Sequence, residues 1–223
     1  MDKKLNGYVD HTILKPAATA ADVRKLCEEA KKYGFASVCI NPCHIAEAKA
    51  YLKDSDVKVC TVIGFPLGAN TAQVKAFETE QAYKLGCDEF DMVINIGALK
   101  DGRDDYVRDE IAAVVRAAQG KCVKVIIETY LLTDEEKARA TRLACEAGAS
   151  FVKTCTGFSG GAATVEDVKL MKANATGGVK IKASAGIRTL ESALALIEAG
   201  AERLGTSSGV KIIEQAIHDL FPM

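Results

Sequence analysis

Hydrophobic and polar positions alternate in two patterns along most of the chain. Short runs rich in β-branched and aliphatic residues are typical of strands that are buried on both faces. Eight such runs follow one another, at residues 8–12, 36–40, 57–64, 88–95, 123–129, 150–154, 179–184 and 202–208. The pattern is weakest in the first and the last run.

Segments with helical periodicity lie between these runs. Each begins at a polar residue that can cap a helix and ends at a glycine that can stop one. The pattern predicts Thr19, Asn70 and Thr133 as N-caps, with Glu136 at the capping-box offset from Thr133. The clearest predicted helices cover residues 19–34, 70–86, 133–148 and 189–200.

Strands that alternate with helices indicate βαβ units and a parallel sheet. Eight units at a spacing of about 28 residues predict a closed (β/α)₈ TIM barrel. We expect one catalytic domain over residues 1–223, with a short N-terminal extension before the first strand. An open doubly wound sheet is the structural alternative, but it usually carries a GxGxxG turn after its first strand, and the sequence has none.

The amino-acid composition and the charge distribution argue against nucleic acid and membranes as binding partners. The 223 residues are 48% hydrophobic and carry a formal net charge of −1, with no basic face that would suit nucleic acid. No run of 18 apolar residues predicts a membrane span, and the N-terminus lacks the apolar region of a secretory signal. These features predict a cytoplasmic protein that binds neither nucleic acid nor membrane.

The eight cysteines are spread over the whole chain, and we expect them to be reduced. Cys39 and Cys43 lie close together and are followed by His44. A zinc site needs a second pair of ligands, whereas His11 and His218 lie far away without motif spacing. The sequence therefore predicts no metal site.

Five charged residues lie in the predicted strands or at their C-terminal ends, where barrel enzymes carry their chemistry: Asp10, Asp91, Glu128, Lys153 and Lys182. Lys153 and Lys182 are 29 residues apart, which is one βα repeat, so both amines should reach the same pocket. Asp91 can pair with them and so compensate their burial. The alternative is that these are structural ion pairs, or that Lys182 faces outward beneath a helix.

Three loops near the end of the chain are rich in small and hydroxyl residues. They cover residues 156–164, 183–193 and 203–213, the first after a predicted strand and the other two at the ends of predicted strands. Backbone N–H groups and helix N-termini meet at such loops and attract anions, and barrels often bind phosphate there. The alternative is ordinary turn glycine, but three such loops in succession favour a phosphate site.

Eight motifs in order resemble the deoxyribose-phosphate aldolase family. They are DHTILKP (10–16), SVCINP (37–42), VIGFPLG (62–68), DEFDMVINIG (88–97), VIIETYLLT (125–133), FVKTCTGF (151–158), IKASAGIRT (181–189) and RLGTSSGV (203–210). The resemblance implies a class I aldolase that cleaves 2-deoxy-D-ribose 5-phosphate to glyceraldehyde 3-phosphate and acetaldehyde, without a cofactor, in deoxyribonucleoside catabolism. It also implies a homo-oligomer, a dimer or a tetramer.

The resemblance also implies roles for single residues. Lys153 matches the Schiff-base lysine, Lys182 the second active-site lysine, and Asp91 the proton-relay aspartate. A lysine attacks a carbonyl only as the neutral amine, which burial and a nearby cation both favour, and we expect Lys182 to be that cation. The remaining candidates bind substrate or phosphate (Thr156, Gly157, Gly186, Arg188, Ser207 and Ser208) or support the site (Asp10, Thr12 and Cys39).

The sequence departs from the family pattern at two places. Ala185 stands where the family often has a glycine in the phosphate loop, and the C-terminal IHDLFPM lacks the terminal tyrosine of some members. Two rival functions stay open on the residues alone. One is a different lysine aldolase on the same fold, and the other is a non-catalytic barrel that binds a phosphosugar.

Overall fold

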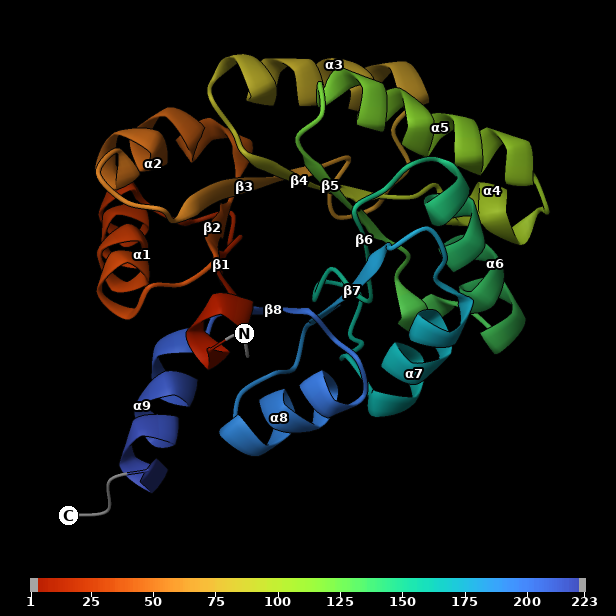
Figure 1. Cartoon of the computed structure of the whole chain (residues 1–223). Coiled ribbons are helices and arrows are strands. Elements are labelled where there is room, and N and C mark those ends of the chain that lie inside the picture. Colours follow the sequence, from red (N-terminus) through yellow and green to blue (C-terminus); the bar gives the residue numbers. More distant parts are fainter. Residues whose placement is uncertain (1–3, 221–223) are drawn as a thin grey trace.

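Eight parallel strands close into a barrel in the computed structural model, which describes residues 4–220 (Figure 1). Each strand pairs with the next in chain order, and the last returns to the first. The TIM barrel prediction is therefore confirmed, and the open doubly wound alternative is wrong. The strands are β1 Val9–Ile13, β2 Ser37–Ile40, β3 Lys58–Ile63, β4 Glu89–Val93, β5 Cys122–Ile126, β6 Phe151–Lys153, β7 Lys180–Ser184 and β8 Arg203–Thr206.

Helices form the outer ring around the strands (Figure 1). They are α1 Ala20–Tyr33, α2 Ile45–Leu52, α3 Ala72–Lys84, α4 Ile96–Lys100, α5 Asp104–Ala117, α6 Asp134–Glu146, α7 Val165–Asn174, α8 Leu190–Glu198 and α9 Gly209–Leu220. Three short 3-10 turns complete the described chain: η1 Leu5–Tyr8, η2 Pro42–His44 and η3 Thr129–Leu131. The turn η1, which lies just before β1, is the described part of the predicted N-terminal extension. Over residues 4–220, no helix is both long and apolar enough to cross a membrane.

The predicted helix caps hold with one correction. Thr19 and Thr133 each form a full capping box, the latter with Glu136. The cap of α3 is Thr71, whose hydroxyl accepts a hydrogen bond from the backbone N–H of Val74, and the prediction of Asn70 is wrong by one residue. Both residues can cap a helix, so only the position of the first helical turn distinguishes them.

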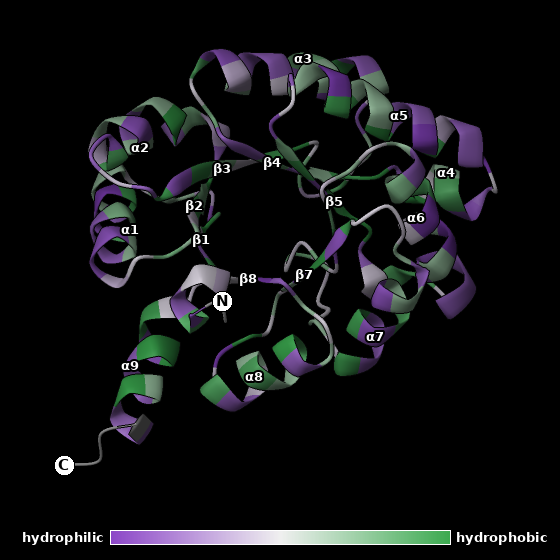
Figure 2. Cartoon of the chain, viewed as in Figure 1, coloured by the Kyte–Doolittle hydropathy of each residue, from purple (hydrophilic) through white to green (hydrophobic). Residues whose placement is uncertain are grey.

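The two faces of the strands differ in chemistry. Side chains that point outward, such as those of Val38, Phe90 and Ile181, are apolar and buried beneath the helices, in the main core. Figure 2 shows hydrophobic and hydrophilic residues alternating along the helices of the ring. Charged side chains gather instead inside the barrel: Asp10, Glu89, Asp91, Lys124, Lys153, Lys182 and Arg203.

The fifth strand is shorter than its apolar pattern predicts. The run 123–129 continues without a break, yet β5 ends at Ile126. Glu128 then takes a left-handed backbone conformation, with φ 56° and ψ 65°, and the turn η3 follows. Buried apolar residues continue past the strand end, so hydrophobicity alone does not mark the turn.

Candidate active site

The carboxylate of Asp91 joins the two lysines that the sequence singled out. Lys153 on β6 and Lys182 on β7 are register partners, as their spacing predicts. Each Nζ donates to the same oxygen, Oδ2 of Asp91, at 2.7 Å. The two Nζ atoms can therefore be no further apart than these two contact distances added together. The alternative in which Lys182 faces outward beneath a helix is wrong.

Lys124 is a third lysine at this carboxylate, and the sequence reasoning missed it. Its Nζ lies 2.8 Å from Oδ1 of Asp91 and 2.6 Å from Oε2 of Glu89. A signal was present, because Lys124 precedes Lys153 by the same 29 residues that separate Lys153 from Lys182. The interval of one βα repeat could therefore have placed all three lysines inside the barrel.

A second group of charges lies next to Lys182. Its Nζ contacts Oδ2 of Asp10 at 2.5 Å, and Oδ1 of Asp10 accepts from Arg203 at 2.7 Å. Arg203, another residue that the sequence reasoning missed, also pairs with Glu89 at 3.0 Å. Asp10, which the sequence analysis expects to support the site, forms an ion pair with Lys182.

Electrostatics hold these groups in their charged forms. Burial raises the pKa of Asp91, but Lys124, Lys153 and Lys182 together lower it more, so this pKa lies well below its usual range. Burial lowers the pKa of Lys182, but Asp10 and Asp91 more than offset this, so the pKa is raised. The site thus contains a carboxylate and an ammonium group in direct contact. Lys182 is a cation, as expected, but the negative charge of Asp91 lies between it and Lys153.

Lys153 opens onto the large cavity at the mouth of the barrel. This cavity has a volume of about 890 Å³, and Lys153, although only 3% exposed, is part of its wall. Asp91 and Lys182, both fully buried, lie beneath Lys153. Among these three residues, Lys153 is the one that a small molecule in the cavity can reach.

The predicted phosphate residues line the same cavity. They are Thr156, Gly157, Gly186, Arg188, Ser207 and Ser208. Gly157 and Gly186 have φ 84° and 77°, a conformation that favours glycine. Ser208 lies immediately before α9, so the N-terminus of this helix faces the cavity and attracts negative charge. Residues from the loops after β6, β7 and β8 thus border one cavity.

Both donors of Thr156, its hydroxyl and its backbone N–H, are already engaged within the protein. Its hydroxyl donates to Oε2 of Glu128 at 2.5 Å, and its backbone N–H donates to Oε1 at 3.3 Å. Its hydroxyl oxygen accepts from the backbone N–H of Phe158 at 3.0 Å. Thr156 therefore orders the loop in this structure rather than presenting a free donor to the cavity.

Thr12, Cys39 and Ala185 lie around the same centre. Thr12 lines the cavity, and its hydroxyl donates to the backbone oxygen of Asp10 at 2.9 Å. Cys39 is fully buried in a small apolar cluster with Leu14, Cys60 and Val62. Ala185 has φ 76°, so this alanine occupies a conformation in which a glycine is less strained.

Cys39, Cys60 and Asp91 are the described residues whose side chains are near enough to one another to hold a metal ion. The carboxylate of Asp91 already accepts from three lysines, and Cys60 also donates to it at 3.2 Å. A hydrogen bond with Cys60 lowers the pKa of Cys39, whereas burial raises that of Cys60. A dication at this position would meet the ammonium groups of Lys124 and Lys182, so the donor set suits an ion-pair centre better than a metal.

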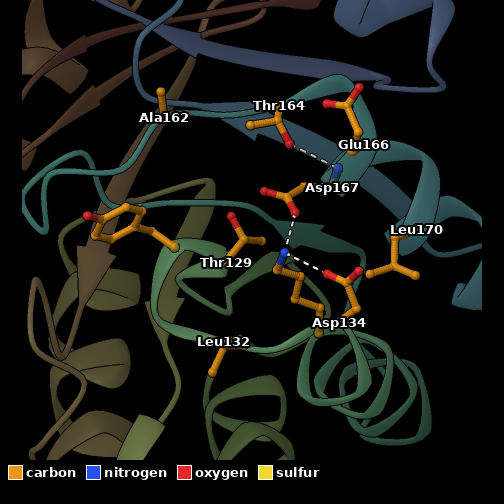
Figure 3. Close-up of a pocket in the computed structure, with 10 residues that line it drawn as sticks. Thr129, Leu132, Asp134, Ala162, Thr164, Glu166, Asp167 and Leu170 are labelled. Carbon is orange, nitrogen blue, oxygen red and sulfur yellow. Dashed lines mark hydrogen bonds and ion pairs between the residues drawn. The ribbon is translucent and has the colours of Figure 1, made fainter.

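A second cavity, of about 350 Å³, lies outside the barrel between the loop after β5 and the start of α7 (Figure 3). The ammonium of Lys137 contacts Asp134 at 3.0 Å and Asp167 at 2.7 Å, so both carboxylates have a cation. None of the predicted site residues lines this cavity. The barrel mouth is therefore the better candidate site.

Comparisons with known proteins agree with this geometry. The model of the DeoC/LacD family of aldolases matches residues 5–215. Deoxyribose-phosphate aldolase of Staphylococcus carnosus is 62% identical over 93% of this chain and 94% of its own length. The enzyme of the same name from a Geobacillus species is 60% identical over 96% of both chains.

A solved structure shows the same fold at lower identity. A tetrameric deoxyribose phosphate aldolase from Aeropyrum pernix superposes with a TM-score of 0.89 and 34% identity, over 96% of this chain and 91% of that one. Family model, sequence relatives and fold agree over nearly the whole chain. The chain therefore belongs to the DeoC/LacD family of aldolases, as an enzyme of the deoxyribose-phosphate aldolase class.

Proposed function

We propose that the chain reversibly cleaves 2-deoxy-D-ribose 5-phosphate to D-glyceraldehyde 3-phosphate and acetaldehyde through a Schiff base on Lys153. The observation that carries this proposal is the position of Lys153. Its amine contacts Asp91 at 2.7 Å and borders a cavity whose other wall is formed by the three predicted phosphate loops. A covalent nucleophile and an anion site thus share one cavity.

The reaction follows from the chemistry of an amine and an aldehyde. The neutral amine of Lys153 adds to C1 of the open-chain sugar, and loss of water leaves an iminium ion. A base takes the proton of the C3 hydroxyl, the electrons of the C2–C3 bond move to the iminium, and glyceraldehyde 3-phosphate leaves. The resulting enamine is protonated at C2, and water releases acetaldehyde and the free lysine.

Asp91 and Lys182 are the groups that we assign to proton transfer. We assign Lys182 as the proton donor and Asp91 as the proton acceptor, each acting directly or through a water. Asp91 contacts both Lys153 and Lys182, which keeps the carboxylate and the second amine within reach of the reacting carbons. Asp10 and Lys124 hold Lys182 and Asp91 in place.

The phosphate group is assigned to the loops after β6, β7 and β8. The backbone N–H groups of Gly157, Gly186 and Ser207, the hydroxyl of Ser208 and the N-terminus of α9 supply donors and positive potential there, while the backbone N–H of Ser208 donates to the hydroxyl of Thr206 at 2.9 Å. Arg188 lines the same wall and adds a full positive charge. Thr156 contributes by ordering the first of these loops.

The test is covalent trapping. Acetaldehyde with borohydride should leave an ethyl group on Lys153, located by peptide mass spectrometry, and should abolish cleavage of 2-deoxyribose 5-phosphate. Lys153→Met is the matched variant and should show neither label nor activity. A label elsewhere with activity intact would contradict the assignment of Lys153.

The same experiment separates the rival functions. A non-catalytic phosphosugar-binding barrel would give no adduct, and a different lysine aldolase would give the adduct without cleaving 2-deoxyribose 5-phosphate. Removal of the 5-phosphate tests the three loops. If the loops bind the phosphate equally well in the ground state and in the transition state, its removal should lower kcat/KM far more than kcat.

We further propose that the enzyme is a homo-oligomer in the cytoplasm. The relative from Aeropyrum pernix is tetrameric, and Leu67, Val74 and Phe77 place large apolar side chains in solvent. All eight cysteines are free, which fits a reducing compartment. Light scattering of the purified protein tests the assembly, and a mass equal to one chain would contradict it.

A further inference from the structure

Glu128 combines burial, charge and backbone strain at the edge of the candidate site. It follows β5 by two residues and is only 1% exposed. Its φ of 56° lies in the left-handed region, which is costly for a residue with a Cβ atom. Such a conformation persists only where the surroundings determine it, and it is found most often at functional sites.

The carboxylate of Glu128 binds a single target, the loop between β6 and α7. Oε2 accepts from the hydroxyl of Thr156 at 2.5 Å and from the hydroxyl of Ser159 at 3.1 Å. Oε1 accepts from the backbone N–H of Thr156 at 3.3 Å. An ionised carboxylate is an acceptor only and bonds more strongly than a neutral one, so it suits three donors converging on it.

This loop connects the two halves of the proposed site. It starts directly after Lys153, and its far end is tied to the phosphate loop by a hydrogen bond from the backbone N–H of Ala163 to the oxygen of Ala185, at 3.0 Å. Gly157 lies against Ala185 in the middle. A displacement of the segment 156–159 would therefore change the distance between the phosphate site and the amine of Lys153.

We propose that Glu128 is a positioning residue that fixes the segment 156–159 and so sets the place of the substrate's phosphate relative to Lys153. The inference rests on the proposed function and deepens it. Glu128 acts through the loop, not on the reacting carbons. Its effect should therefore be large for a phosphorylated sugar, which spans both halves of the site, and small for acetaldehyde, which needs only Lys153.

The test compares these two substrates in matched variants. Glu128→Gln keeps the size and backbone strain but loses one acceptor oxygen, and it turns an amide N–H₂ toward donors. Glu128→Gly removes the carboxylate and relieves the strain together. Glu135→Gln is the control, because Glu135 is an exposed residue of α6 a few positions along.

Both Glu128 variants should lower kcat/KM for 2-deoxyribose 5-phosphate by about tenfold to a hundredfold, as a misplaced substrate does. The rate at which acetaldehyde and borohydride label Lys153 should stay close to that of the wild type, as should the rate with unphosphorylated 2-deoxyribose. Glu135→Gln should leave all three unchanged. If Lys153 of the wild type is not labelled, the proposed function is overturned. This result is distinct from the outcomes that test Glu128.

Two outcomes would overturn the role of Glu128. One is an unchanged kcat/KM for the phosphorylated sugar, and the other is an equal loss with all three reagents, which indicates damage to Lys153 itself. If neither Glu128 variant folds by circular dichroism, Ser159→Ala decides. It removes one of the three bonds from the loop side, and it should show a smaller loss confined to the phosphorylated sugar.

Discussion

Asp91→Asn tests the charge centre of the barrel most directly. The carboxylate of Asp91 contacts Lys124, Lys153 and Lys182 at 2.7–2.8 Å, and all of these groups are buried. Asparagine has nearly the same shape but no charge. It also turns an N–H₂ group toward at least one ammonium, so the variant replaces an attraction by a repulsion.

The expected loss of stability is large. Loss of one partner from a buried ion pair costs about 3–5 kcal/mol, because a charge stays buried without compensation. Lys124 and Lys182 retain Glu89 and Asp10 as partners, and Lys153 can turn toward the cavity. We therefore expect the lower end of that range, about 3 kcal/mol in the free energy of unfolding near pH 7.

The pH dependence has a definite sign. The pKa of Asp91 is lower in the folded than in the unfolded chain, where it is about 3.9. Its stabilisation is therefore complete above about pH 4 and is lost, at about 1.4 kcal/mol per pH unit, as the pH falls toward the folded pKa. The difference between wild type and Asp91→Asn should shrink by about 1 kcal/mol between about pH 6 and pH 3.

Urea denaturation of both proteins across this pH range measures the difference. Asp109→Asn is the control, because Asp109 forms an exposed pair with Arg108, and its loss should leave the stability nearly unchanged at every pH. A cost below about 1 kcal/mol for Asp91→Asn, or a difference that does not shrink in acid, would refute the view that the lysines hold Asp91 ionised.

Three further predictions concern activity and the phosphate loop. Lys182→Met should lower kcat by about 10²–10⁴-fold through loss of proton transfer, while acetaldehyde and borohydride still label Lys153; a wild-type kcat would remove Lys182 from the mechanism. Ala185→Gly should stabilise the protein by up to about 1 kcal/mol and raise Tm by a few degrees, because relief of the left-handed strain exceeds the added freedom of the unfolded chain; a lower Tm would contradict this reading of φ. Prolonged EDTA treatment should leave activity intact, since the iminium on Lys153 supplies the electron sink; loss on chelation with recovery on zinc would point to a metal aldolase.

The order of the helices and strands and the closure of the barrel could be predicted from local signals in the sequence. Apolar runs at a regular interval, polar caps and glycine stops are local signals, and they agree with one another along the chain. Lys153 and Lys182 could be paired for the same reason, because one βα repeat brings a residue to the equivalent position on the next strand. Local signals were ambiguous where two neighbouring residues could both cap a helix, as with Asn70 and Thr71.

The contacts inside the barrel were decided by the tertiary structure alone. Asp91 meets Lys124, Lys153 and Lys182 across 33, 62 and 91 residues, and no local pattern states which of several inward charges will touch. The sequence showed Glu128 as a charged residue at the end of a strand. It did not show the turn at Glu128, because the apolar run continues through the point where the backbone changes direction. Hydrophobic pattern reports which face of an element is buried. Which charges pair depends on the stagger of eight strands around a closed barrel, and this is set only when the last strand meets the first.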